Sequence, residues 1–374
     1  EVAVPLEKAD GGIILTASHN PKPWNALKLL NEKGEFLNGG EGEKILEIAE
    51  AEAFDFSDVD SLGTIVENDA YMDIHIDEVL NLPLVDVAAV KAAQFKVVVD
   101  GVNSSGGIII PKLLELMGVE VVKLYCEPNG HFPHNPEPLK EHLTDISELV
   151  VKEKAHLGIV VDPDVDRLAF ISEDGEMFGE EYTLVACADY VLSKTPGNTV
   201  SNMSSSRALR DVTNAHNGSY EASAVGEVNV VELMKKNNAI IGGEGNGGII
   251  YPELHYGRDS LVGVALFLTH LANKKMTVSA LRASYPEYYM SKNKIELTPQ
   301  IDVDAILVAM TDKYKNEDIT TIDGVKIDFA TEWVHLRKSN TEPIIRIYTE
   351  APSQPEADVL ALRIIDEIKV IAGI

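Results

Sequence analysis

The sequence predicts an α/β protein of several domains that ends in a smaller α+β domain. The chain has 374 residues, which is too long for one hydrophobic core, so two to four domains are expected. Strand and helix patterns alternate from Lys96 to Leu124 and again from Thr199 to Ile241, which is typical of βαβ units. Near the C-terminus, strands are grouped over 325–349 between two helices, and this order indicates an α+β fold.

Composition restricts the partners and the compartment. The 32 basic and 60 acidic side chains give a net charge of −28, so we expect neither nucleic acid nor an anionic membrane as the main partner. No apolar run reaches the roughly 20 residues of a membrane span, and the N-terminus does not resemble a signal peptide. Cys126 and Cys187 are too few for a disulfide framework or a zinc site. We expect them to be small core residues of a cytoplasmic protein.

The first candidate site lies between Gly11 and Pro21. The apolar run Ile13–Leu15 predicts a buried strand, and the polar, turn-forming residues Thr16–Pro21 end it. Ser18 is therefore expected on a loop at the end of a strand, where α/β proteins bind ligands, and it is a candidate nucleophile or phosphate carrier. The alternative is a serine turn that caps the next element.

A second strand is predicted over Trp24–Leu30. A hairpin could return the ammonium of Lys28 to the Ser18 hydroxyl, although a lysine on a strand is often only solvated. Helical periodicity follows over Glu41–Phe54, and residues 55–61 are an acidic linker. We place the first domain boundary near residue 65.

The second domain is predicted as α/β. Its glycine-rich turn at 101–107 does not follow the Gly-x-Gly-x-x-Gly pattern, so no dinucleotide site is expected. The predicted elements are helix Tyr71–Leu80, strand Lys96–Asp100, helix Ile108–Met117, strand Glu120–Leu124, helix Asp145–Lys154 and strand Leu157–Val161.

The second candidate site, Asp162-Pro163-Asp164-Val165-Asp166-Arg167, follows that last strand. Carboxylates at alternate positions of an extended loop point to one side, and three hard oxygen ligands suit Mg²⁺ beside a phosphate. A calcium loop is the alternative, because Glu173 stands at the twelfth position from Asp162. Arg167, however, occupies the position that must be glycine in such a loop, and the flanks are predicted strands rather than helices.

The third candidate site is the glycine-rich segment 242–248, in which Glu244 and Asn246 offer an acceptor and a mixed donor and acceptor for sugar hydroxyls. A plain glycine-rich turn is the alternative. The surrounding predicted elements are strand Thr199–Asn202, helix Ser206–Ala215, strand Ala239–Ile241, helix Asp259–Leu271 and a closing segment Val278–Tyr285.

The fourth candidate site is Arg337-Lys338-Ser339-Asn340-Thr341-Glu342-Pro343, with Arg346 just beyond. Two guanidinium groups with hydroxyl and amide donors can bind a phosphate, and the alternative is a polar surface hairpin. The predicted neighbours are strand Lys294–Leu297, helix Val303–Tyr314, strands Val325–Phe329, Glu332–Leu336 and Ile344–Thr349, and helix Glu356–Ile371.

Together and in this order, the four segments resemble the α-D-phosphohexomutases, a family of phosphoglucomutases, phosphomannomutases and phosphoglucosamine mutases. The resemblance covers essentially the whole chain. It implies four domains around a central cleft, of which the first three share an α/β core and the last is a smaller α+β domain that moves. The expected domains are residues 1–65, which contain Ser18, and residues 66–175, which contain the metal loop. Residues 176–290 form the domain with the sugar-recognition loop, and residues 291–374 form the domain with the phosphate-binding loop.

The resemblance also implies roles for individual residues. Ser18 resembles the family's phosphoserine, which also contacts the metal, and Lys28 resembles the general acid/base. His19 and Arg167 resemble two residues of the catalytic centre. The implied cofactor is Mg²⁺, with a hexose 1,6-bisphosphate as activator, and the implied partners are sugar phosphates. The implied Mg²⁺ ligands are Asp162, Asp164 and Asp166, and the implied substrate-binding residues are Glu244, Asn246, Arg337, Ser339, Asn340, Thr341 and Arg346.

Three features depart from the family pattern. The glycine-rich strand and arginine that usually begin the first domain do not precede Glu1, so we expect that domain to be partial. Asn246 and Gly248 stand where serine and histidine are common in the family. The form with asparagine and glycine is most similar to the archaeal-type phosphoglucosamine mutases. Glu227 stands where relatives often carry histidine or aspartate, and its carboxylate could pair with a substrate ammonium. We therefore expect a phosphoglucosamine mutase.

The alternatives are a phosphomannomutase or phosphoglucomutase, a catalytically impaired fragment that binds sugar phosphates, and a metal-dependent phosphatase. A monomer or a homodimer is expected.

Overall fold

The computed structural model describes residues 1–296, 301–338 and 344–373. The chain forms two compact units. The first comprises residues 1–183 and 247–279, and the second comprises residues 184–246 and 280–374. Each unit is described by itself below.

The chain begins with helix α1 (Ala3–Glu7) and a two-stranded antiparallel sheet of β1 (Gly12–Leu15) and β2 (Leu27–Leu30). The expectation of a buried first strand is wrong, because Ile13 and Leu15 are 66% and 78% exposed. Their face of β1 is left uncovered by the residues that the structure describes. The second strand is also shorter than predicted, since residues 24–26 precede it.

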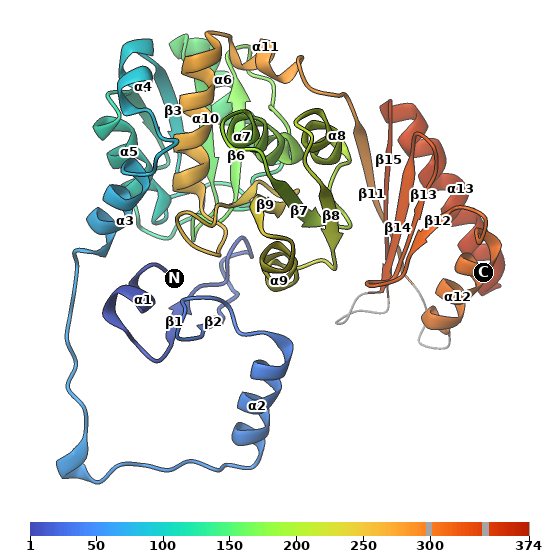
Figure 1. Cartoon of the computed structure of the whole chain (residues 1–374), viewed down its shortest axis with the longest axis horizontal. Helices are drawn as coiled ribbons and strands as arrows, with labels where there is room; N and C mark the ends of the chain where they lie inside the picture. The colour runs from blue at the N-terminus through green and yellow to red at the C-terminus, as the bar shows by residue number, and fades with distance from the viewer. Residues whose placement is uncertain (297–300, 339–343, 374) are drawn as a thin grey trace. The chain divides into compact units, whose positions relative to one another are not determined.

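Helix α2 (Gly39–Glu50) starts two residues earlier and ends four residues earlier than predicted. Asn38 caps it through a capping box, in which its side chain accepts from the Glu41 amide and the Glu41 carboxylate accepts from the Asn38 amide. A long segment with a short 3₁₀ turn, η1 (Val59–Ser61), then leads to helix α3 (Tyr71–Leu80), as Figure 1 shows. Helix α3 has the predicted bounds, whereas the short helix α4 (Val87–Ala93) was not predicted.

The main sheet of the first unit has the strand order β4-β3-β5-β6. Strand β3 is parallel to β4 and β5, whereas β6 runs antiparallel to β5. Val97, Val98 and Val99 of β3 are fully buried, which explains their continuous apolar run. The elements are β3 (Lys96–Asp100), α5 (Gly106–Leu116), β4 (Glu120–Leu124), η2 (Lys140–His142), α6 (Thr144–Glu153), β5 (Leu157–Val161) and β6 (Leu168–Ser172).

Helix α10 (Ser260–Lys274) packs on this unit, and its Phe267 ring stacks on Phe170 of β6 with centroids 3.8 Å apart. The short strand β10 (Gly248–Ile250) precedes it. Helices α7 (Glu180–Lys194) and α11 (Val278–Arg282) lie where the chain passes between the two units. Cys187 of α7 is buried as expected, whereas Cys126 is only half-buried.

The second unit contains parallel strands in the order β9-β7-β8. Strand β8 and helix α9 were not predicted. The elements are β7 (Asn198–Asn202), α8 (Ala208–Ala215), β8 (Tyr220–Ser223), α9 (Glu227–Asn237) and β9 (Ala239–Glu244).

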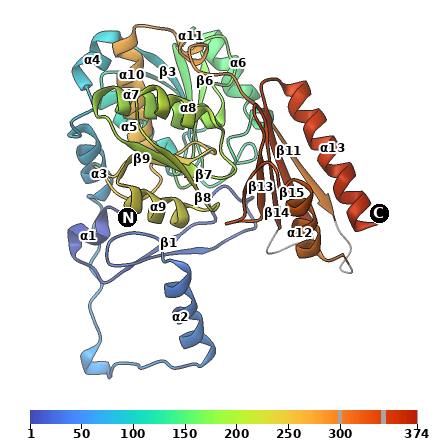
Figure 2. The same cartoon turned by 45° about the vertical axis from the view of Figure 1, so that its right-hand side comes forward.

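The C-terminal part of this unit is an antiparallel sheet of order β11-β15-β14-β13-β12. Helices α12 and α13 both contribute to the core on one face of the sheet, as Figure 2 lets the reader follow. This arrangement confirms the predicted α+β domain. The elements are β11 (Tyr289–Glu296), α12 (Val303–Lys313), β12 (Asp318–Thr320), β13 (Val325–Asp328), β14 (Trp333–Lys338), β15 (Ile344–Ala351) and α13 (Gln354–Ala372).

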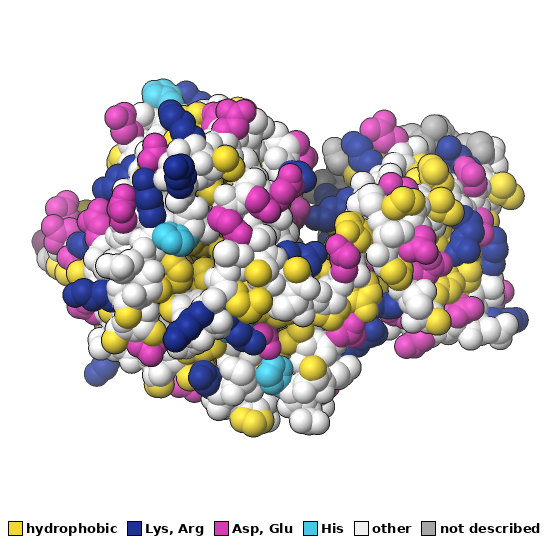
Figure 3. Space-filling model, turned by 90° about the horizontal axis from the view of Figure 1, so that it is seen from above, with side chains coloured by type: hydrophobic (Ala, Val, Ile, Leu, Met, Phe, Trp, Pro, Cys, Tyr) yellow, Lys and Arg dark blue, Asp and Glu magenta, His cyan; other side chains and the backbone are white. Residues whose placement is uncertain are grey.

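Acidic and basic side chains are interspersed on the face drawn in Figure 3. Among the described residues, none of the helices combines the length and the apolarity that crossing a bilayer requires.

Candidate active site

Ser18 lies at the tip of the loop that follows β1. Its backbone is in the left-handed region at φ 52°, which is unusual for a residue with a Cβ and is frequent at functional sites. The Ser18 amide donates to Oγ1 of Thr16 at 2.8 Å, and the Asn20 amide donates to the Ala17 carbonyl at 3.1 Å. These bonds hold the tight turn that presents the Ser18 hydroxyl.

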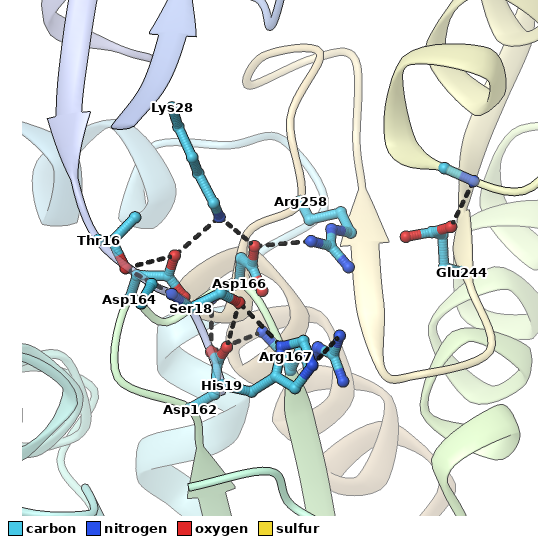
Figure 4. Close-up of polar contacts among 12 residues, drawn as sticks. Thr16, Ser18, His19, Lys28, Asp162, Asp164, Asp166, Arg167, Glu244 and Arg258 are labelled. Carbon is cyan, nitrogen blue, oxygen red and sulfur yellow. Dashed lines mark hydrogen bonds and ion pairs between the residues drawn. The ribbon is translucent and has the colours of Figure 1, made fainter. Parts of the chain in front are cut away.

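The Ser18 hydroxyl points at the aspartate loop, as Figure 4 shows. Its Oγ donates to Oδ2 of Asp162 at 3.3 Å. The other oxygen of Asp162 accepts from the backbone amides of Asp166 and Arg167, both at 3.0 Å. The loop is thereby closed around Asp162, which is fully buried directly after β5.

The three loop carboxylates converge. One oxygen from each of Asp162, Asp164 and Asp166 lies within 4.8 Å of the others. Burial and the neighbouring carboxylates raise the pKa of Asp162 well above its usual value. Burial also acts to raise the pKa of Asp166, but Arg258 and Lys28 outweigh it and lower that pKa to about 2. This concentration of buried negative charge requires cations nearby.

The donor set fits Mg²⁺. Oδ1 of Asp164 and Oδ1 of Asp166 are buried and make no hydrogen bond to any residue that the structure describes. A buried carboxylate oxygen without a partner is costly unless a ligand completes it. An all-carboxylate oxygen set suits a hard cation. The calcium-loop alternative is wrong, because the flanks are strands β5 and β6 and the Glu173 carboxylate accepts from the Ser279 amide instead.

Lys28 projects from β2 to this cluster. Its Nζ lies 2.7 Å from Oδ2 of Asp164 and 2.8 Å from Oδ2 of Asp166. Burial acts to lower the pKa of Lys28, but the two carboxylates outweigh it and raise that pKa. The side chain is therefore an ammonium that bridges the two carboxylates.

Arg167, His19 and Ser18 form a chain of contacts. Nη2 of Arg167 lies 3.2 Å from Nε2 of His19, and Nδ1 of His19 lies 3.1 Å from Oγ of Ser18. Because a guanidinium can only donate, Nε2 of a neutral His19 must accept and Nδ1 must carry the proton. Burial and the Arg167 charge lower the pKa of His19, which favours this neutral form. The chain then runs from Arg167 through His19 and Ser18 to Asp162.

Three residues of this centre were not predicted from the sequence. The hydroxyl of Thr16 donates to Oδ2 of Asp164 at 3.1 Å. Oε1 of Glu137 accepts from Nη1 of Arg167 at 2.6 Å, and Nη2 of Arg258 donates to Oδ2 of Asp166 at 2.7 Å. Thr16 lay inside the Ser18 segment and could have been included with it.

The third candidate site lies in the second unit. Oε1 of Glu244, the last residue of β9, accepts from Nδ2 of Asn202 at 2.8 Å and from the Gly226 amide at 3.1 Å. Glu227, the first residue of α9, is buried and directly follows Gly226 in the chain. Asn246 lies in the turn that follows β9.

Arg337 and Arg346 also lie in the second unit, as direct cross-strand partners on β14 and β15. Nε of Arg337 lies 3.0 Å from Oδ1 of Asp323 and 2.9 Å from Oδ2. Ser339, Asn340 and Thr341 lie outside the described residues. The structure thus brings the predicted catalytic residues together in one unit, and the predicted cleft towards the substrate-binding residues stays a prediction.

The site combines a serine, three carboxylates, a lysine and an arginine in contact with one another. Such a centre can transfer a phosphoryl group with metal assistance. Comparison with known proteins gives the family. The four domain models of phosphoglucomutase/phosphomannomutase match in order: alpha/beta/alpha domain I over residues 1–56, domain II over 73–175, domain III over 179–289 and the C-terminal domain over 294–367.

Among curated relatives, a phosphoglucomutase/phosphomannomutase from Thermococcus kodakarensis is 35% identical over 93% of this chain and 76% of its own length. A phosphoglucosamine/phosphogalactosamine mutase from Sulfurisphaera tokodaii is 31% identical over 97% of this chain and 80% of its own. A crystal structure of a phosphoglucomutase/phosphomannomutase family protein from Burkholderia thailandensis superposes with a TM-score of 0.82 at 25% identity, covering 97% of this chain and 76% of that one.

The chain therefore belongs to the phosphoglucomutase/phosphomannomutase family, and it is an enzyme of the phosphohexomutase type. The predicted four-domain architecture is that of this family.

Proposed function

We propose that this protein interconverts the 6-phosphate and the 1-phosphate of an amino sugar, as a phosphoglucosamine mutase. The observation that carries the mutase chemistry is the Ser18 hydroxyl, 3.3 Å from a carboxylate of the aspartate triad. In this proposal Ser18 carries a phosphoryl group between turnovers. Asp162, Asp164 and Asp166 hold Mg²⁺, which when bound offsets the negative charge that develops on the transferred phosphoryl group.

The first half-reaction transfers the phosphoryl group from Ser18 to the free sugar hydroxyl. The bond between phosphorus and Ser18 Oγ breaks, and a bond between phosphorus and the sugar oxygen forms. The Lys28 ammonium gives a proton to Ser18 Oγ, and the proton of the sugar hydroxyl restores the ammonium. Arg167 and His19 steady the Ser18 oxygen. The resulting sugar bisphosphate turns over and returns its other phosphate to Ser18, so protons and phosphoryl groups balance over a cycle.

The remaining residues would recognise the substrate. Glu244 is a candidate acceptor for sugar hydroxyls, with Asn246 beside it in the chain. Arg337 and Arg346, with Ser339, Asn340 and Thr341, would bind the phosphate that is not transferred. A hexose 1,6-bisphosphate would act as activator by phosphorylating Ser18. We propose the domain bounds 1–65, 66–175, 176–290 and 291–374, and a cytoplasmic location.

The preference for an amino sugar rests on Glu227, a buried residue that directly follows Gly226, whose amide contacts Glu244. The carboxylate of Glu227 could pair with a substrate ammonium. The name of the Sulfurisphaera relative is consistent with this preference. A second candidate function is phosphomannomutase or phosphoglucomutase, which the name of the Thermococcus relative favours.

Intact mass before and after incubation with glucose 1,6-bisphosphate and Mg²⁺ tests the carrier. We expect a gain of one phosphoryl group that is absent in Ser18→Ala and retained in Ser57→Ala, since Ser57 is an exposed serine between α2 and α3. Ser18→Ala should still bind sugar phosphate without turning it over. Binding without phosphate uptake by the unaltered chain would instead indicate an impaired binding protein, and steady phosphate release without isomer formation would indicate a phosphatase.

Turnover of glucosamine, mannose and glucose 6-phosphates tests the sugar. Glu227→Gln should raise the KM for glucosamine 6-phosphate several-fold more than that for glucose 6-phosphate. Glu232→Gln, an exposed position on the same helix, is the matched control. Equal losses for both sugars would remove the argument for an amino sugar.

A further inference from the structure

Two histidines and an aspartate converge in the first unit, outside the aspartate triad. We call His75, His255 and Asp259 the histidine cluster. Nε2 of His75 lies 2.6 Å and Nε2 of His255 lies 3.0 Å from the same oxygen, Oδ2 of Asp259. One donor atom from each residue lies within 4.8 Å of the others. The phosphohexomutase chemistry proposed above assigns no role to this cluster.

The backbone fixes the three side chains on two elements. His75 lies on α3, whereas His255 and Asp259 belong to the segment that leads into α10. Oδ1 of Asp259 caps α10 by accepting from the amides of Leu261 and Val262 at 2.7 and 3.2 Å. The cap holds one carboxylate oxygen and turns the other towards both imidazoles, so the aspartate is anchored before any ligand binds.

A second carboxylate lies behind His255. Its Nδ1 is 3.0 Å from Oε2 of Glu1. A carboxylate on the far nitrogen of an imidazole is the arrangement that orients metal-binding histidines and leaves Nε2 for the metal. The carboxylates of Asp259 and Glu1 on the two sides of His255 concentrate negative charge there, which favours a divalent cation.

A cavity beside the cluster leaves room for a further ligand. It has a volume of about 320 Å³ and is lined by all three cluster residues and also by Lys28 and Asp166. His75 is 23% exposed and His255 is 14% exposed, so solvent reaches them. A catalytic or accessible zinc site commonly combines three protein ligands with one water, which this cavity can hold.

We propose that His75, His255 and Asp259 form a second divalent-metal site, separate from the aspartate triad, that takes an imidazole-preferring transition metal such as Zn²⁺. Two imidazole nitrogens and one carboxylate oxygen match that class, whereas the all-oxygen triad matches Mg²⁺. Ligand atoms of a tetrahedral zinc site lie about 3.3 Å apart, given bonds of about 2.0 Å. Small movements of the two imidazoles away from Asp259 would therefore bring the three ligand atoms to the spacing that a metal ion requires.

The consequence is a metal link between α3 and the start of α10. Arg258, the residue before Asp259, donates to Asp166 of the triad. A metal on the cluster would therefore steady the segment that supplies one of the cations around the aspartate triad. This role is structural rather than catalytic, because nothing in the proposed reaction requires a second metal.

Cobalt binding to the full chain tests the proposal without relying on activity. The protein is stripped with a chelator, incubated with Co²⁺ in excess Mg²⁺ so that the triad is saturated, and dialysed. We expect one cobalt per chain by elemental analysis and the strong visible absorption of tetrahedral Co²⁺, with Zn²⁺ displacing it. Both signals should be lost in His75→Ala, a part-exposed position, and in His255→Gln.

Two variants serve as controls. His216→Gln removes another histidine paired with an aspartate, since Nε2 of His216 lies 2.8 Å from Oδ1 of Asp189, and it should retain the cobalt. Asp162→Asn should also retain it, because the triad is a separate site. Circular dichroism verifies that each variant is folded. Absence of retained cobalt in the unaltered chain, or equal retention in His75→Ala, would overturn the proposal.

Discussion

The Lys28 ammonium lies 2.7 Å from Oδ2 of Asp164, although 136 positions separate the two residues in the sequence. It thus occupies a carboxylate that we propose as a magnesium ligand. The same ammonium contacts Asp166, so it competes with a metal for two of the three triad residues.

Lys28→Met should therefore bind Mg²⁺ more tightly and turn over more slowly. Charges about 4 Å apart near a protein surface interact by several kcal/mol, so we expect at least about a tenfold gain in Mg²⁺ affinity by calorimetry. Loss of the acid/base should lower kcat by about 10²- to 10⁴-fold. Lys22→Met, in the loop between β1 and β2, is the control and should change neither. Weaker Mg²⁺ binding in Lys28→Met would contradict the competition.

Glu137 positions Arg167 through a 2.6 Å ion pair. Glu137→Gln should leave the guanidinium less fixed against His19 and reduce kcat by about tenfold, with little change in KM, because Ser18 rather than the substrate loses its support. Glu141→Gln, an exposed position on η2, should have no effect. A change confined to KM would show that Glu137 acts on substrate binding instead.

The sequence predicts most reliably the elements in which a continuous apolar run is also buried. Strands β3 and β5, which are buried over almost their whole length, have their predicted bounds. Helix α4 is short and rich in alanine, and strand β8 is short and half-buried, so neither has a clear periodic signal. The run Ile13–Leu15 misled for the opposite reason, because an apolar run predicts burial only where another layer covers it.

The residues of the candidate site also fall into two groups, those that one short segment of sequence reveals and those that only the fold brings together. Ser18 and the three aspartates were predicted because each group lies in one short segment of the chain. Glu137 and Arg258 were missed because their partners Arg167 and Asp166 are 30 and 92 positions away, and only the fold brings them together. Lys28 was a candidate from its position in the predicted hairpin, but its contacts with Asp164 and Asp166 appear only in the structure.

Asp323 holds the proposed phosphate ligand Arg337 and also accepts from the Val225 amide at 2.9 Å. Asp323→Asn keeps a hydrogen-bond acceptor but removes the negative charge, so it should tighten the binding of inorganic phosphate about threefold. Asp323→Ala removes the acceptor as well and should weaken it. Calorimetry on both variants measures the contrast, with Asp318→Asn on β12 as control. A change in phosphate affinity in the same direction in both variants would show that Asp323 does not act on the phosphate site.

His335 makes the stability of the C-terminal sheet depend on pH. It is 2% exposed on β14, between Oγ of Ser204 and the backbone carbonyl of Asp323. Burial lowers the pKa of His335 to about 4, and the nearby positive charge of Lys326 adds to this effect. The folded protein therefore resists protonation of His335, whereas the unfolded chain takes up that proton near its ordinary value of about 6.5.

A depressed histidine pKa gives stability that is present above about pH 6.5 and is lost as the pH falls towards 4. Between pH 7 and pH 5 we expect a loss of about 2 kcal/mol from this group alone. Urea unfolding at both pH values, followed by the fluorescence of the buried Trp333, measures it. His335→Gln should be less stable at pH 7 and should lose about 2 kcal/mol less on acidification. An equal loss in the variant would assign the pH dependence to other groups.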